Sequence, residues 1–329
     1  MSKPKVYVTR KLTDPAMEYL NANCDLRYWG GDDAVPREVL LQEVRDVEGI
    51  LSMLADPMNE EVFKAAPKLR VVSNMAVGFD NIDVPSATNR GIMVANTPGV
   101  LTEATADMAW ALLMASARRI GEGDRLVRAG GWQGWSPLFM CGQDVYGSTL
   151  GIIGMGRIGL AVARRAKGFG MKVIYNKRNR DLDAEQELGL QYVSLEDLLK
   201  NSDYVSVHCP LTPETRHLLG EKEFAMMKPT AILVNTARGA VIDEEAMYRA
   251  LRDKLIWAAG LDVFDREPIS ADHPLLSLDN VVVAPHLGSA TYNTRSEMAM
   301  ISARSVIQGV TGHVPEFLLN PGYQYHTNI

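Results

Sequence analysis

The stretch TLGIIGMGRIG at residues 149–159 decides the fold of this chain. Its glycines, Gly154, Gly156 and Gly159, have the G-x-G-x-x-G spacing of a turn that binds the pyrophosphate of a dinucleotide. They follow an apolar strand pattern and precede a helical pattern, IGLAVARRAKGFG, which leads into a second strand pattern, KVIYN. The glycines of such a unit permit a tight turn, close approach of the backbone to the anion and close helix–strand packing. This context favours a dinucleotide site over a purely structural glycine turn.

Two series of short β-branched runs alternate with helical patterns along the chain. The first series is KVYVT, DLRYW, GILSM, RVVSN and IMVAN, and the second is TLGIIG, KVIYN, YVSVHC, AILVN, WAAGLDVF and NVVVAPH. Such alternation is typical of βαβ units and parallel sheets. We therefore predict an α/β protein with two doubly wound parallel-sheet domains. A helix over residues 101–120, with Thr102 as its N-cap, would join them. A last helix over residues 294–312 would complete either domain.

Composition excludes several classes of function. The 329 residues are 47% hydrophobic and 22% charged, which is globular and long enough for two domains. A net charge of −6 gives no reason to expect nucleic acid as a partner. Three scattered cysteines make neither a disulfide framework nor a zinc site, and we expect no metal. The start has no apolar signal core, and the longest apolar segment, MAWALLMASA, is about half a membrane span. We expect a soluble, cytoplasmic protein with no membrane partner.

The stretch VIYNKRNR at residues 173–180 bears on the choice of cofactor. A unit that binds NAD normally ends its second strand in an acid that holds the ribose 2′-OH, but no Asp or Glu lies between Gly151 and Arg180. Lys177, Arg178 and Arg180 instead offer charge-assisted partners for a 2′-phosphate, with Arg178 as the first choice. This favours NADPH over NADH. The alternative is a solvated basic loop.

Three polar residues each follow an apolar strand pattern: Arg238 in AILVNTARG, Glu267 in LDVFDREP and His286 in VVVAPHLGSAT. Because ligands of open α/β sheets bind beyond the carboxyl ends of the strands, these side chains are expected to converge. A histidine can give a proton to a carbonyl oxygen as hydride arrives, a carboxylate can orient its ring, and an arginine can grip a substrate carboxylate. Taken singly, each residue is equally consistent with a structural role.

Together these motifs resemble those of the D-isomer-specific 2-hydroxyacid dehydrogenases, and within them the glyoxylate/hydroxypyruvate reductases. The resemblance covers essentially the whole chain. It rests on VGFDNID at 77–83, LGIIGMGRIG at 150–159, HCPLTPETRHLLG at 208–220, NTARGAVIDEEA at 235–246, AAGLDVFDREP at 258–268 and APHLGSAT at 284–291. It implies a Rossmann-like NAD(P)-binding domain, residues 102–291, inserted into a flavodoxin-like substrate domain, residues 1–101 and 292–329.

The resemblance also implies a role for individual residues. Arg238 would bind the substrate carboxylate and carbonyl, Glu267 would support the histidine, and His286 would be the acid–base group. The backbone amides of Val77 and Gly78 would help to hold the carboxylate. Cofactor contacts are implied at Thr105, Gly154, Gly156, Arg157, Ile158, Gly159, Asn176, Lys177, Arg178, Arg180, Cys209, Pro210, Thr215, Thr236, Ala237, Asp262, His286 and Gly288, with Asp262 near the nicotinamide amide and Thr105 at the domain hinge.

The predicted function is the NADPH-dependent reduction of glyoxylate to glycolate or of hydroxypyruvate to D-glycerate. One alternative is a broader NAD(P)-dependent D-2-hydroxyacid dehydrogenase that acts on pyruvate or 2-ketogluconate. An alternative of another class is a dinucleotide-sensing corepressor with the same fold. The segment GGWQGWSPLFMCGQDVYG, residues 130–147, resembles the dimer arm of the reductases and predicts a homodimer, with Trp135 or Phe139 shaping the substrate pocket. The alternative for this segment is core packing of a long connection.

Overall fold

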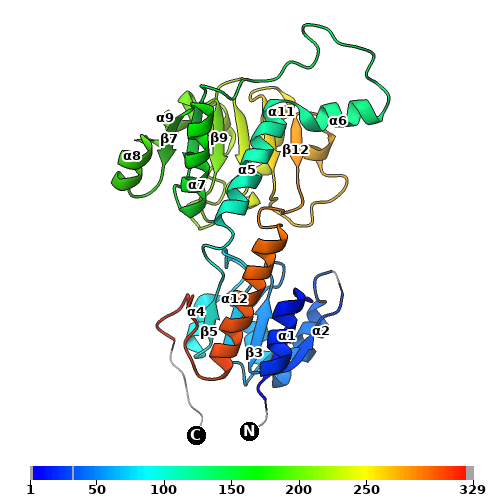
Figure 1. Ribbon diagram of the computed structural model, residues 1–329, viewed down its shortest axis with the longest axis vertical. Helices are drawn as coiled ribbons and strands as arrows, with labels where there is room; N and C mark the ends of the chain where they lie inside the picture. Colours follow the sequence, from blue (N-terminus) through cyan, green and yellow to red (C-terminus); the bar gives the residue numbers. More distant parts are fainter. Residues whose placement is uncertain (1–2, 32, 324–329) are drawn as a thin grey trace. The chain divides into compact units, whose positions relative to one another are not determined.

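The protein is an α/β structure made of two compact units, each built on a parallel sheet (Figure 1). The computed structural model describes residues 3–31 and 33–323. The first unit comprises Met1–Leu101 and Ala290–Ile329, and the second comprises Thr102–Ser289. Every strand pair within both sheets is parallel. The predicted fold class is therefore confirmed.

The first unit has a five-stranded sheet in the order β2-β1-β3-β4-β5. This is the flavodoxin-like order, in which the strand sequence reverses between β1 and β3. The strands are β1 Lys5–Val8, β2 Asp25–Tyr28, β3 Gly49–Ser52, β4 Val71–Asn74 and β5 Met93–Ala95. The helices are α1 Asp14–Asn23, α2 Arg37–Glu43, α3 Glu60–Ala65, α4 Val84–Asn89 and α12 Tyr292–Val310, with the short 3-10 helix η1 Val44–Asp46.

Alternate residues along the strands of the first sheet belong to two separate apolar cores. Val6 and Val8 of β1 pack with α1 and α12, whereas Tyr7 between them packs on the other face with α2, α3 and α4. This is the period of two expected for a strand covered by helices on both faces. The last helix, whose domain the helical pattern alone left open, therefore packs on the first sheet (Figure 1).

The second unit has a seven-stranded sheet in the order β12-β11-β10-β9-β6-β7-β8. This is the dinucleotide-binding order extended by one strand, and it reverses between β6 and β9. The strands are β6 Thr149–Ile153, β7 Lys172–Asn176, β8 Gln191–Tyr192, β9 Tyr204–Val207, β10 Ile232–Asn235, β11 Ala258–Leu261 and β12 Val281–Val283. The helices are α5 Thr102–Ala117, α6 Ile120–Arg128, α7 Arg157–Ala166, α8 Leu182–Leu188, α9 Leu195–Asn201, α10 Glu221–Phe224 and α11 Glu244–Arg252, with η2 Lys167–Phe169, η3 Gly239–Val241 and η4 Pro274–Ser277.

Helices also cover both faces of the second sheet. Buried side chains of α5 and α7, such as Trp110 and Val162, pack on one face. Buried side chains of α9, α10 and α11, such as Leu198, Phe224 and Met247, pack on the other. Both faces of the central strands are thus apolar, which explains their nearly continuous hydrophobic sequence.

The structure contains all eleven predicted strands and adds one. The added strand is β8, which has only two residues and so no recognisable sequence pattern. The predicted helix over residues 101–120 is α5, but it begins at Thr102 itself, so this residue lies in the first turn and is not the N-cap. The helix ends before position 120 because Arg119 has a left-handed backbone, with φ 54°, and starts the separate helix α6.

The described residues carry free cysteines but neither a membrane-spanning helix nor a metal-binding group. None of the helices in residues 3–31 and 33–323 is long and apolar enough to cross a membrane. The same stretches hold no group of three or more His, Cys, Asp or Glu side chains that could bind a metal ion. Cys24, Cys141 and Cys209 are all free thiols.

Candidate active site

Two of the three glycines after β6 have a structural reason to be glycine, whereas the third faces open space. Gly154 has φ 92°, and a Cβ there would lie 2.4 Å from the backbone nitrogen of Cys209, at the end of the neighbouring strand β9. A Cβ on Gly159 would lie 2.5 Å from the carbonyl oxygen of Gly154. A Cβ on Gly156, in contrast, would meet nothing within 4 Å. Gly156 is the N-cap of α7, so the open space lies where unpaired N–H groups favour an anion.

The loop after β9 flanks this turn, and the loop after β10 follows on the next strand of the sheet. The Thr215 hydroxyl donates to the Pro210 carbonyl at 2.6 Å and accepts from the Thr212 N–H at 2.8 Å, which closes the loop after β9. Burial raises the pKa of the Cys209 thiol to about 11, so this side chain is uncharged at neutral pH. Thr236 is 8% exposed, and no residue in the described part of the chain is hydrogen-bonded to its hydroxyl. A buried hydroxyl without a partner is costly, so this atom fits a site that a bound group completes.

Asn176 connects the glycine turn to the basic stretch. Its carbonyl accepts a hydrogen bond from the Gly154 N–H, and its side-chain amide donates to the Val193 carbonyl, both at 2.9 Å. Lys177 follows, and its ammonium group lies 3.4 Å from the carboxylate of Asp181. Asp181 is the first acid after residues 151–180, which contain no Asp or Glu. Asp181 also caps α8 by accepting from the Ala184 N–H. The position expected for a ribose-binding acid is therefore occupied by a cation with its own carboxylate partner.

The two arginines of this stretch differ in their partners. Arg180 forms a two-pronged ion pair with Glu185, at 2.6 and 3.0 Å, and its guanidinium lies 5.7 Å from the centre of the Tyr192 ring. Arg178 is exposed and takes part in no ion pair among residues 3–31 and 33–323. Hydrogen bonds from Thr212 and from its own backbone lower the pKa of Glu214, and the charge of Arg178 acts in the same direction. Arg178 thus has its charge available near the loop that follows β9.

His286 and Glu267 form a hydrogen-bonded pair beyond β12 and β11. His286 Nδ1 lies 2.7 Å from Glu267 Oε2, and the two side chains are 33% and 36% exposed. The other carboxylate oxygen of Glu267 accepts the Phe264 N–H at 2.9 Å. Burial opposes ionisation of Glu267, but the hydrogen bond and the charge of His286, together with the Phe264 N–H, bring the pKa of Glu267 below its usual value. The carboxylate is therefore charged at neutral pH and fixed on one side of the imidazole.

Asp262 holds the loop that carries His286. It is 1% exposed, and its carboxylate accepts the N–H groups of Leu287 and Gly288 at 2.6 and 2.7 Å. Its carbonyl accepts the N–H of His286 at 2.9 Å, where the backbone has the unusual φ of 54°. Burial raises the pKa of Asp262, and the two N–H donors oppose that rise. A Cβ on Gly288 would touch both Asp262 and Thr105 of α5, so these three predicted cofactor residues lie together.

Arg238 lies in the turn after β10, next to the segment that carries Glu267. Asn235 shapes this turn by donating to the Arg238 carbonyl and accepting the Ala237 N–H, both at 2.9 Å. A Cβ on Gly239 would lie 1.8 Å from the carbonyl carbon of Phe264, so the two turns are in backbone contact. The charge of Arg238 also helps to lower the pKa of Glu267. The structure therefore brings Arg238 and the His286–Glu267 pair to one edge of the second sheet.

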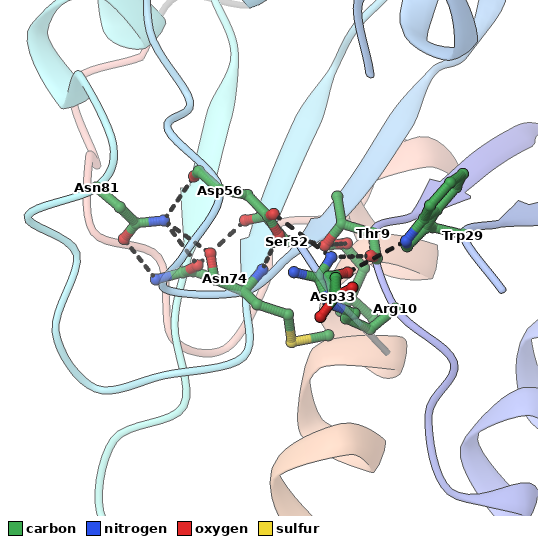
Figure 2. Close-up of polar contacts among 10 residues, drawn as sticks. Thr9, Arg10, Trp29, Asp33, Ser52, Asp56, Asn74 and Asn81 are labelled. Carbon is green, nitrogen blue, oxygen red and sulfur yellow. Dashed lines mark hydrogen bonds and ion pairs between the residues drawn. The ribbon is translucent and has the colours of Figure 1, made fainter. Parts of the chain in front are cut away.

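Val77 and Gly78 belong to the first unit, in the loop after β4. The side-chain amide of Asn96 donates to the Val77 carbonyl at 2.7 Å, and that of Asn74 donates to the Gly78 carbonyl at 2.9 Å. Both asparagines are buried, and Figure 2 shows Asn74 within a larger polar network. The sequence motifs did not single out either residue, because an asparagine next to a strand usually caps a turn. In the sequence, each is an Asn at the end of a strand pattern, RVVSN or IMVAN, and its burial is visible only in the structure.

Known proteins resemble this chain over nearly its whole length. A sequence profile of the D-isomer specific 2-hydroxyacid dehydrogenase NAD binding domain matches residues 110–288. A glyoxylate reductase of Korarchaeum cryptofilum is 53% identical, with 98% of this chain and 100% of that protein covered. A crystal structure of a Thermus thermophilus protein has a TM-score of 0.90 and 43% identity, covering 96% of this chain and 99% of that one.

A further solved structure is that of an NADPH-dependent glyoxylate/hydroxypyruvate reductase of Sinorhizobium meliloti in complex with NADP and malonate. It has a TM-score of 0.84 and 31% identity, and all of both chains is covered. The profile covers more than half of this chain, and the Korarchaeum cryptofilum protein matches 98% of it. The chain therefore belongs to the D-isomer specific 2-hydroxyacid dehydrogenase family of NAD(P)-dependent oxidoreductases, and within it to the glyoxylate reductase type.

Proposed function

We propose that this protein reduces small 2-keto acids with NADPH, converting glyoxylate to glycolate and hydroxypyruvate to D-glycerate. The observation that carries the proposal is the His286–Glu267 pair, 2.7 Å apart, beside the Arg238 turn on the sheet that also carries the open glycine turn. A proton donor, an anion-binding group and a dinucleotide turn on one sheet edge are what the reduction of a 2-keto acid needs. The relatives named glyoxylate reductase support the substrate class.

When bound, the nicotinamide cofactor supplies the hydride. Glu267 engages Nδ1 of His286, which leaves Nε2 as the ring nitrogen that gives a proton to the carbonyl oxygen of the substrate. The charged carboxylate stabilises the imidazolium and fixes the ring, since a histidine held from one side presents its other nitrogen in a defined direction. Arg238 binds the substrate carboxylate through its forked donors and polarises the neighbouring carbonyl.

The proposal assigns the remaining contacts to the backbone and to one cation. Gly154, Gly156 and Gly159 hold the dinucleotide, and the N–H groups of Val77 and Gly78 bind the substrate carboxylate. Arg178 contacts the 2′-phosphate, because its charge has no ion-pair partner among the described residues, whereas Lys177 is paired with Asp181 and Arg180 with Glu185. NADH, which lacks that phosphate, is the less favoured cofactor.

We also propose that the protein is a homodimer joined through residues 130–147, the arm. The arm has no helix or strand (Figure 1). Several of its large apolar side chains face solvent: Trp135 is 82%, Leu138 87% and Tyr146 80% exposed within one chain. Core packing of these side chains within one chain is thus excluded. Contiguous exposed apolar side chains mark interfaces, which favours a second copy as their cover.

Steady-state kinetics with purified protein test the proposal. The substrates are glyoxylate, hydroxypyruvate and pyruvate, each with NADPH and with NADH at matched concentrations. We expect the highest kcat/KM for glyoxylate or hydroxypyruvate with NADPH. Preference for pyruvate would identify a broader D-2-hydroxyacid dehydrogenase instead. Binding of NADPH without its oxidation by any 2-keto acid would identify a dinucleotide sensor.

A further inference from the structure

Two peptide units in the loop after β4 are held from behind by residues that follow β5. The Ala76 carbonyl accepts the Thr97 N–H at 2.8 Å, and the Val77 carbonyl accepts the side-chain amide of Asn96 at 2.7 Å. In a planar trans peptide the C=O and the N–H point in opposite directions. Fixing the Ala76 carbonyl therefore fixes the N–H of Val77, and fixing the Val77 carbonyl fixes the N–H of Gly78.

These two N–H groups are available to a ligand. Val77 and Gly78 are half-buried, and neither N–H donates a hydrogen bond to a residue in the described part of the chain. An accepted hydrogen bond also polarises its peptide unit, which makes the N–H on the other side a stronger donor. Residues 96 and 97 thus aim two adjacent donors and strengthen them, and two adjacent donors suit the two oxygens of a carboxylate.

Asn74 anchors the same loop at its next peptide unit. Its side-chain amide donates to the Gly78 carbonyl at 2.9 Å and to the Asn81 side-chain oxygen at 3.1 Å, and its own side-chain oxygen accepts the Ser52 hydroxyl at 3.1 Å (Figure 2). Asn81 in turn donates to the Met53 carbonyl at 3.1 Å. The loop after β4 is therefore tied both to its own strand and to the loop after β3.

The far end of this network is a buried carboxylate. Asp56 is 2% exposed; it accepts the Thr9 hydroxyl and the Met53 N–H, the latter at 2.9 Å, and lies 3.6 Å from the guanidinium of Arg10 (Figure 2). Its carbonyl accepts the side-chain amide of Asn81 at 3.0 Å. A continuous set of buried and part-buried polar contacts thus runs from the end of β1 to the loop that carries Val77 and Gly78.

We propose that Asn96 is a positioning residue for substrate binding, which orients the N–H of Gly78 toward the carboxylate of a 2-keto acid, and that Asn74 supports it by holding the next peptide unit. This inference rests on the proposed function. Neither asparagine touches the substrate; each acts through the backbone. Loss of Asn96 should therefore weaken the hold on the carboxylate and leave the cofactor and the proton donor in the second unit unaffected.

The test compares Asn96→Ala with a matched control, Asn320→Ala. Both asparagines are 5% exposed; Asn96 directly follows β5, and Asn320 binds the backbone of Ile92 and Val94 and the hydroxyl of Thr88. Both changes should lower thermal stability. Only Asn96→Ala should raise the KM for glyoxylate, by about ten-fold, with the kcat and the KM for NADPH nearly unchanged, since an interaction made equally in the ground and transition states affects KM alone.

A KM for glyoxylate that is equal in the Asn96→Ala and Asn320→Ala proteins would overturn the inference while leaving the proposed function intact. Absence of turnover by the unsubstituted protein would instead overturn the proposed function.

A second measurement, on the unsubstituted protein, tests the inference even if Asn96→Ala does not fold. Oxamate, an unreactive analogue of a 2-keto acid, is added to the NADPH complex, and the backbone amides are followed by ¹⁵N-edited NMR. Downfield shifts of the Val77 and Gly78 N–H signals support the inference, and unmoved signals overturn it.

Discussion

Each sheet reverses its strand order at one position, its switch point, and the two switch points differ in what occupies them. In the first unit the switch point lies between β1 and β3, and its loops carry Thr9, Arg10 and Asp56, which bind one another (Figure 2). In the second unit it lies between β6 and β9, where a Cβ on Gly156 would meet no atom within 4 Å. One switch point is occupied by the protein's own polar groups, and the other has room for a ligand.

This difference shows how one architecture serves two tasks. Open α/β sheets bind ligands at the switch point because the connections leave it in opposite directions there. In the first unit that position is used to fix two loops, so its residues contribute stability and precision. In the second unit it is kept clear for a dinucleotide, so its residues contribute binding. Changes at the two points should therefore have separable effects.

The largest effect is expected at the edge of the second sheet. His286→Gln should lower kcat for glyoxylate by 10²–10⁴-fold, roughly the loss that follows removal of a general acid. The affinity for NADPH, measured by fluorescence titration, should stay within about two-fold of the unsubstituted protein, because His286 is not part of the glycine turn. Turnover that survives the substitution would remove His286 from the proton-donor role.

The next effect concerns the first switch point. Asp56→Ala leaves Arg10 without its buried partner and removes the acceptor of the Thr9 hydroxyl, so we expect a loss of about 3 kcal/mol of unfolding free energy. Chemical denaturation measures it. Asp46→Ala is the control, because Asp46 pairs with Lys5 and Arg27 at the surface of the same unit and its loss should change stability little. The NADPH affinity of the Asp56→Ala protein should be unchanged; a parallel loss would mean that the two switch points are not separable.

A smaller effect is expected in cofactor choice. Arg178→Ser should lower the preference for NADPH over NADH by about ten-fold, the worth of one charge-assisted phosphate contact. Lys172→Ser is the control, because Lys172 is an exposed cation at the other end of the same strand, β7. Replacing Lys177 by Asp in addition should move the preference further toward NADH. An unchanged ratio of kcat/KM values would show that this stretch is a solvated basic loop.

The smallest effect is a pH dependence of stability at the His286–Glu267 pair. The pKa of Glu267 in the folded protein lies below its ordinary value of 4.5, so the folded state binds this proton less readily than the unfolded state. The pair should therefore stabilise the fold above about pH 4.5, and this contribution should disappear as the pH falls through the lowered pKa. Melting temperatures of the unsubstituted and Glu267→Gln proteins should differ slightly at neutral pH and converge in acid. A constant difference across that range would contradict this explanation.

The sequence predicted most of the fold and the edges that carry the site. Periodic apolar runs such as KVIYN depend only on neighbours along the chain, so they could be recognised one by one, and β8 was missed because two residues carry no period. Arg238, Glu267 and His286 could be placed on one sheet edge because the carboxyl ends of parallel strands share that edge.

Specific side-chain contacts could not be predicted in this way. Arg180 is paired with Glu185, so its charge is not available to a phosphate. This pairing depends on the fold of the turn between β7 and α8, which the sequence pattern does not specify. The hold of Asn96 on the Val77 carbonyl joins residues nineteen positions apart and involves a backbone atom, which has no residue-specific signal. Side chains that act through the backbone are therefore the part of the site that the sequence reveals least.

The central claim is that the glycine turn of the second unit receives the dinucleotide, and NADPH titration of Gly156→Val tests it most directly. A Cβ at Gly156 meets no protein atom within 4 Å, and its φ of −94° suits any residue, so the variant should fold normally. Gly168→Val is the control, because Gly168 lies just beyond the other end of α7 and is equally open. We predict that Gly156→Val weakens NADPH binding on the order of 100-fold, about 2.7 kcal/mol, whereas Gly168→Val leaves it unchanged. Equal NADPH affinity of the two variants would contradict the claim.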